Sequence, residues 1–73
     1  MNTTEFLKQK TGVDFTGVTN DARLDLPPGW DSVAMVNLVV ALEEHMGRML
    51  EFEEIDGLVT VADVRQLLMD GTS

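Results

Sequence analysis

The chain has 73 residues and a formal net charge of −8 at pH 7, from 13 acidic against 5 basic side chains, and it contains no cysteine. This length predicts a single domain over residues 1–73 with one small core and little room for a deep enzyme cleft. The acidity argues against nucleic acid or an anionic membrane as partner, because phosphate contacts need clustered Lys and Arg. Without cysteine there can be no disulfide, and a thiol that the protein needs has to be imported.

The sequence contains no stretch that approaches the length and apolarity of a membrane span. Met1 is followed by the polar residues Asn2, Thr3 and Thr4, which do not form a secretory signal. We therefore expect a cytoplasmic protein without a membrane span, and we expect it to be a monomer.

The first predicted helix begins at Asn2, which has Glu5 at the spacing of a capping box. Phe6 and Leu7 supply a short apolar face, and the helix is expected to stop at Thr11-Gly12. The next segment, 13–29, has no helical period and is rich in turn formers, so it is predicted to be a long loop. Such a loop needs anchors, and the candidates are its own apolar residues Val13, Phe15, Val18, Leu24 and Leu26.

The longest predicted helix follows the breaker Pro27-Pro28-Gly29 and starts at Asp31-Ser32, two residue types that favour helix caps. Gly47 is expected to end it after Met46. Its predicted core stripe follows the i, i+3, i+4, i+7 spacing and contains Met35, Leu38, Val39, Leu42 and Met46.

A second apolar stripe on the same helix, formed by Val33, Val36 and Val40, lies roughly opposite the first, beside Glu43 and Glu44. Two interpretations are open at this point. Either the helix is central and buried on two sides, or the valines remain exposed for a partner.

In the C-terminal third, the sequence predicts at most one turn of helix, followed by one longer helix. The segment from Glu51 to Asp56 is short and acidic, with Phe52 and Ile55 as its expected inward residues. The last helix is expected to be capped by Thr60 and to end before Gly71, with a buried face of Val61, Val64, Leu67 and Leu68 and with Asp63 at capping-box spacing. The predicted fold is all-α, a small four-helix bundle of three main helices and a short third helix.

The residues alone do not predict a catalytic site. At the start of a helix, Asp31-Ser32 is most simply a cap. Activation of Ser32 as a nucleophile needs a base, but the single histidine, His45, lies roughly 20 Å further along the same helix at 1.5 Å per residue. A calcium loop around Gly57 is rejected, because its first carboxylate would have to be Phe52. We therefore expect neither catalytic residues nor metal ligands.

The segment Gly29-Trp30-Asp31-Ser32-Val33 and the helix after it resemble the acyl carrier protein family, with its aspartate-serine-leucine motif and following helix. The segment from Leu58 to Val64 is similar to the start of that family's last helix. The resemblance covers residues 24–68. It implies a four-helix bundle whose serine is modified by a phosphopantetheinyl transferase, using coenzyme A and magnesium.

The resemblance implies that Ser32 is the attachment residue of a covalent 4′-phosphopantetheine arm, taken from coenzyme A, and that Asp31 takes part in transferase recognition. The arm would hold acyl or aminoacyl groups as thioesters for a loading enzyme and downstream biosynthetic enzymes. The stripe of Val33, Val36 and Val40, with Glu43 and Glu44 at its edge, is the expected docking surface.

The chain departs from the family at two places. Its predicted first helix is shorter, and Ala34 and Asn37 stand where many fatty-acid carriers have acidic residues, which favours a dedicated biosynthetic partner. Trp30 either contributes to that specificity or packs against the loop. The leading hypothesis is a stand-alone carrier that is not an enzyme. The alternative is a small acidic protein-interaction domain of carrier-like fold, in which Ser32 is unmodified and caps the helix.

Overall fold

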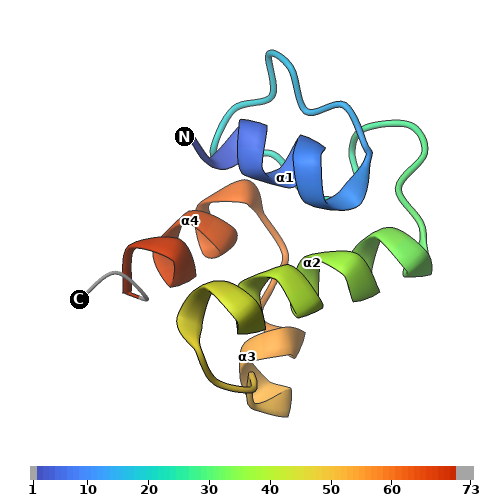
Figure 1. The fold of residues 1–73 in the computed structure, drawn as a ribbon. Coiled ribbons are helices and arrows are strands. Elements are labelled where there is room, and N and C mark those ends of the chain that lie inside the picture. Colours follow the sequence, from blue (N-terminus) through green and yellow to red (C-terminus); the bar gives the residue numbers. More distant parts are fainter. Residues whose placement is uncertain (1, 71–73) are drawn as a thin grey trace.

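The computed structural model describes residues 2–70, and these form four helices (Figure 1). They are α1 (Thr3–Thr11), α2 (Ser32–Met46), α3 (Phe52–Asp56) and α4 (Val61–Asp70). The helices α1, α2 and α4 pack against one another, while the short α3 lies below α2 in the view of Figure 1. The predicted all-α bundle with a short third helix is confirmed. The expected stop at Gly71 lies outside the described residues.

The core lies where α1, α2 and α4 meet. Leu38 and Leu42 of α2 are fully buried, as predicted. The other three residues of the predicted stripe, Met35, Val39 and Met46, are partly buried against the core. Ala34 and Ala41 are buried as well, so the buried face of α2 follows the i, i+4, i+7 spacing from Ala34. The remaining fully buried large side chains come from the other helices and the long loop: Leu7, Phe15, Val61 and Val64.

Both ends of α1, the end of α2 and the start of α4 are those that the sequence predicts. The side chain of Asn2 accepts the Glu5 N–H at 2.9 Å and caps α1. Gly12 and Gly47 adopt left-handed conformations after α1 and α2, with φ of 76° and 72°. At the start of α4, the Thr60 hydroxyl accepts the Asp63 N–H at 3.3 Å and the Asp63 carboxylate accepts the Thr60 N–H at 2.9 Å. The predicted capping box of α4 is therefore present.

The loop over 13–31 is held to the bundle by side chains and by its backbone. Val13, Phe15 and Leu24 are buried and Val18 is partly buried, as expected. Three backbone bonds also join the loop to the start of α4: Leu24 N–H to Val59 O at 2.9 Å, Val61 N–H to Ala22 O at 3.0 Å, and Ala62 N–H to Asn20 O at 2.8 Å. The loop is thus one edge of the bundle rather than a free connection.

Two expected core residues lie on the surface. Leu26 is 66% exposed, because a turn closed by the Leu26 N–H and the Arg23 carbonyl buries Leu24 and leaves Leu26 outside. Phe52 is 80% exposed, since it occupies the first turn of α3 while Leu50 and Leu58, on either side of that helix, fill the core. The expectation that Ile55 faces inward is confirmed by its partial burial.

An ion pair fixes the connection between α2 and α3. The Arg48 guanidinium donates two hydrogen bonds of 2.9 Å to the two carboxylate oxygens of Glu54. Glu54 also accepts the Glu51 N–H at 2.9 Å and so caps α3. These bonds, Arg48 first and the Glu51 N–H second, lower the pKa of Glu54 to about 2.

We predict that Arg48→Gln raises the pKa of Glu54 toward its ordinary value of 4.5. A lowered folded-state pKa means that Glu54 stabilises the fold above pH 4.5 and that this contribution is lost as the pH falls toward 2. The measurement is an NMR titration of the Glu54 side-chain carboxyl. Arg23→Gln is the matched control, because Arg23 pairs with Asp25 instead. The same Glu54 midpoint in wild type and Arg48→Gln would contradict the prediction.

Candidate functional site

Ser32 is the first residue of α2 and is exposed. The cap of this helix is Asp31, whose side chain accepts the Ala34 N–H at 2.9 Å. The Asp31 carbonyl accepts the Met35 N–H at 3.1 Å and begins the helical bonding. The hypothesis that Ser32 caps the helix is therefore wrong, because Asp31 already occupies that position. Within residues 2–70 the Ser32 hydroxyl has no hydrogen-bond partner.

The two residues before Asp31 form a turn that is packed against the long loop. Gly29 has a φ of 93°, a left-handed conformation that glycine adopts without strain. The ring of Trp30 then packs edge-to-face on the buried ring of Phe15, with centroids 5.9 Å apart. Of the two roles considered for Trp30, packing against the loop is thus observed. It fixes the backbone one residue before the cap.

The electrostatics at Ser32 favour an anion. The first N–H groups of a helix lack partners within the helix, and the helix dipole places partial positive charge at this end. No acidic side chain lies in the first turn of α2. A phosphate ester on the Ser32 oxygen would therefore sit where a helix N-terminus stabilises negative charge.

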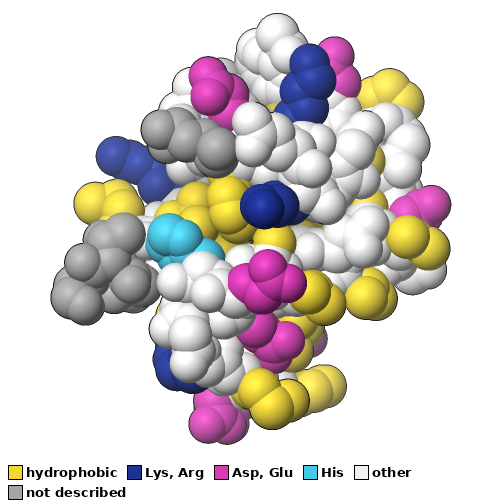
Figure 2. Space-filling model, in the orientation of Figure 1, with side chains coloured by type: hydrophobic (Ala, Val, Ile, Leu, Met, Phe, Trp, Pro, Cys, Tyr) yellow, Lys and Arg dark blue, Asp and Glu magenta, His cyan; other side chains and the backbone are white. Residues whose placement is uncertain are grey.

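An apolar surface extends along α2 from Ser32. Val33, Val36 and Val40 are 63%, 59% and 46% exposed, and we call these three residues the valine surface. Figure 2 shows hydrophobic side chains at the surface along α2 and again near α3. The three valines are therefore exposed rather than buried on a second side of α2, while their role toward a partner stays a prediction.

The two glutamates at the far edge of the valine surface differ. Glu44 is exposed. Glu43 is partly buried, and its carboxylate accepts the Leu50 N–H at 2.9 Å, so it also holds the loop after α2. Sequence reasoning missed two further apolar side chains near this edge, Met49 and Phe52, each 80% exposed. Their sequence pattern does not distinguish them from core residues.

The single histidine of the chain lies out of reach of Ser32. His45 lies in the last turn of α2, thirteen residues from Ser32, which is about 20 Å along the helix. Its Nε2 lies 3.2 Å from the Leu68 carbonyl oxygen, and its ring meets Phe6 edge-to-face. Among the side chains that the structure describes, those of residues 2–69, no three of His, Asp or Glu gather in a way that could hold a metal ion. None of the helices in this part of the chain has the length and apolarity to cross a membrane.

Comparison with known proteins gives a consistent set of relatives, although no protein-family model matches the chain. An acyl carrier protein of Saccharopolyspora erythraea is 33% identical over 66 residues, which cover 90% of this chain and 70% of that protein. The acyl carrier protein MbtL of Mycolicibacterium paratuberculosis is 42% identical over 59 residues, or 81% of this chain and 66% of that protein. MbtL of Mycobacterium tuberculosis is 41% identical over 58 residues, or 80% of this chain and 69% of that protein.

We predict that Asp31→Ala lowers the free energy of unfolding by about 1 kcal/mol, because it removes the bond to the Ala34 N–H. Ser32→Ala is expected to change it by less than about 0.5 kcal/mol, since the hydroxyl contributes no cap. Urea unfolding followed by circular dichroism measures both values. A cost for Ser32→Ala equal to that of Asp31→Ala would refute the assignment of the cap.

Proposed function

This chain belongs to the acyl carrier protein family, and from that premise we propose that Ser32 bears a covalent 4′-phosphopantetheine arm. Acyl carrier proteins generally carry such an arm. The observation that carries the proposal is the exposed Ser32 hydroxyl, which has no hydrogen-bond partner in the described chain, at the N-terminus of α2 behind the Asp31 cap. A hydroxyl in this position is open to an incoming enzyme and suited to a phosphodiester.

The modification requires a separate enzyme, a phosphopantetheinyl transferase. The Ser32 oxygen would attack the phosphorus of coenzyme A that carries the pantetheine, which forms a phosphodiester to the arm and breaks the diphosphate bond. Adenosine 3′,5′-bisphosphate would leave, and the hydroxyl proton would pass to a base of the transferase. The distance to His45 supports this division of labour, because the single histidine of the chain does not reach Ser32. Asp31 stands next to the reacting oxygen and is exposed, which suits a role in recognition by the transferase.

The arm supplies the thiol that this cysteine-free chain lacks. Acyl or aminoacyl intermediates would be held on it as thioesters, loaded by one partner enzyme and consumed by others. In this proposal the chain performs no chemical step. It fixes the position of the arm and provides a surface that each partner binds in turn.

The valine surface is the proposed docking site for these partners. Its three valines adjoin Ser32 on the same helix, so a partner that covers them places its active site near the arm. No charged residue occurs in α2 before Glu43, while Glu44 is exposed beyond the last valine. An apolar centre with charge at the edge is the usual composition of a transient interface.

Intact mass spectrometry tests the modification. Incubated with coenzyme A, magnesium and a phosphopantetheinyl transferase, the protein is expected to gain the mass of one phosphopantetheine group, and Ser32→Ala is expected to gain none. The two proteins should fold equally well, so the variant isolates the hydroxyl. No gain by the wild type, or the same gain by Ser32→Ala, would refute the proposal. The first result would favour the alternative, an acidic protein-interaction domain with unmodified Ser32.

A second test concerns docking. We predict that Val36→Gln lowers kcat/KM of the transferase for this protein about fivefold, because an apolar contact at the centre of the interface is lost. Val59→Gln is the matched control: Val59 is 42% exposed but precedes α4, away from Ser32. Circular dichroism verifies that both variants fold. Equal kcat/KM values for Val36→Gln and wild type would show that the valine surface is not the docking site.

A further inference from the structure

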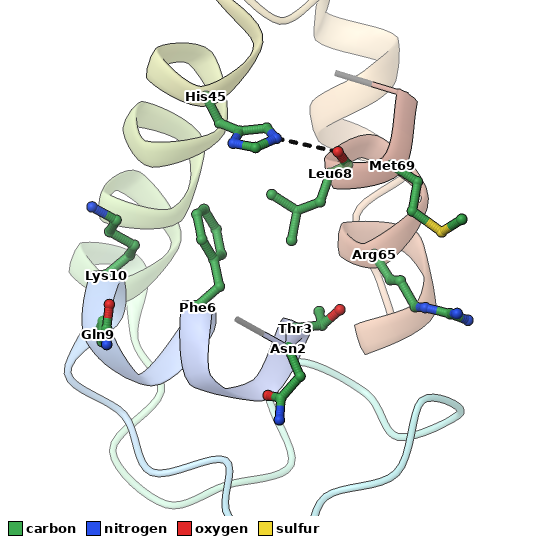
Figure 3. Close-up of a pocket in the computed structure, with 9 residues that line it drawn as sticks. All are labelled: Asn2, Thr3, Phe6, Gln9, Lys10, His45, Arg65, Leu68 and Met69. Atoms are coloured by element: carbon green, nitrogen blue, oxygen red, sulfur yellow. Dashed lines mark hydrogen bonds between the residues drawn. The ribbon is translucent and has the colours of Figure 1, made fainter. Parts of the chain in front are cut away.

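A groove opens between α1, α4 and the C-terminal end of α2, at the end of the bundle away from Ser32. Its volume is about 670 Å³, within the range of small-molecule sites. Figure 3 shows Phe6 of α1 and Leu68 of α4 pointing into it, with His45 of α2 closing one end. The full lining is Asn2, Thr3, Phe6, Gln9, Lys10, His45, Arg65, Leu68 and Met69.

Two basic side chains of this acidic protein line the groove. They are Lys10 and Arg65, out of five Lys and Arg in the chain, and the single histidine, His45, lines it as well. In the close-up of Figure 3, Lys10 and Arg65 lie on opposite rims. Neither makes an ion pair with the side chains that the structure describes, those of residues 2–69, whereas Arg23 is paired with Asp25 and Arg48 with Glu54. Unpaired cations are notable in a chain with 13 acidic residues.

The floor of the groove is apolar. Phe6 is only 7% exposed, and Leu68 is partly buried against the core. The ring of His45 stacks edge-to-face on Phe6 while its Nε2 lies 3.2 Å from the Leu68 carbonyl oxygen, so the three residues form one continuous wall. In Figure 2, hydrophobic atoms are visible in this hollow between the histidine and a basic side chain. An alkyl chain that lies along this wall would be partly removed from water, and burial of its apolar surface favours binding.

From this arrangement we propose that the groove between α1 and α4 binds a small amphiphilic anion, a carboxylate with an unbranched alkyl chain. The chain lies along Phe6 and Leu68, and the carboxylate is held at the rim by Lys10 or Arg65. The carboxylate belongs at the rim rather than near His45, because the C-terminal ends of α2 and α4 carry partial negative charge. The net charge of −8 does not prevent this, since charges more than about 8 Å apart are largely screened at physiological salt.

This site is independent of the arm on Ser32. His45 is about 20 Å from Ser32 along α2, and none of the residues that line the groove belongs to the valine surface. The experiment is therefore carried out on the Ser32→Ala protein, which cannot be modified. Its result stands whether or not the proposed modification of Ser32 is correct.

The test is a titration with sodium decanoate, followed by two-dimensional amide NMR. Saturable shifts are expected to concentrate at residues of α1, α4 and the last turn of α2. Decanol lacks the charge and acetate lacks the chain, so each is expected to bind at least fivefold more weakly. Shifts that concentrate on α2 near the valine surface, or no saturable binding of decanoate, would overturn the proposal. So would equal binding of decanol, which would indicate an apolar patch without anion recognition.

Charge-removing variants sharpen the test. Lys10→Gln with Arg65→Gln is expected to weaken decanoate binding about fivefold and to leave decanol binding unchanged. Lys8→Gln is the matched control, because Lys8 is an exposed lysine of α1 that does not line the groove. An equal loss of affinity in Lys8→Gln would show a general charge effect and overturn the site. An acidic peptide that displaces decanoate more strongly than octanoate of equal concentration would show that the groove is a protein-docking site instead.

Discussion

The hydrogen bond from the Ala34 N–H to the Asp31 carboxylate determines what Ser32 can do. A helix needs a side chain to satisfy its first N–H groups, and both Asp31 and Ser32 are suited to this role. Because Asp31 takes it, Ser32 becomes the first residue of α2, with its hydroxyl exposed and without a partner in the described chain. The same bond fixes the direction in which α2 starts. It therefore sets both the position of the Ser32 hydroxyl and the orientation of the valine surface beside it.

The helix α2 has a buried face and an exposed apolar face. One face buries Leu38 and Leu42 against α1 and α4, and the other leaves Val33, Val36 and Val40 in contact with solvent. The main helix–helix contacts of the described chain join α1, α2 and α4, and they leave Val33, Val36 and Val40 uncovered. An exposed apolar face thus lies next to Ser32, and a transient partner can cover it.

The sequence predicts those parts of the fold that depend on residues close together in the chain. Caps depend on residues within one turn, so Asn2 with Glu5 and Thr60 with Asp63 could be identified from spacing alone. Leu26 and Phe52 were assigned to the core wrongly, because their burial depends on how distant segments pack. The backbone hydrogen bonds of Leu24 and Val61, which join the long loop to the start of α4, likewise cannot be predicted from the periodicity of the sequence. For the candidate site, the sequence located the start of α2 but could not decide which residue was the cap.

The two ends of α2 differ in chemistry, and the reason lies in the distribution of charge. Its first eleven residues carry no ionisable side chain, while Glu43, Glu44 and His45 follow in its last turn. Near Ser32 a partner therefore meets an apolar face and the positive end of a helix dipole. At the other end, His45 joins α2 to α4 beside a groove edged by Lys10 and Arg65. Because about 20 Å of helix separates these ends, occupation of one leaves the other accessible. The docking and the anion binding that we propose would therefore not exclude each other.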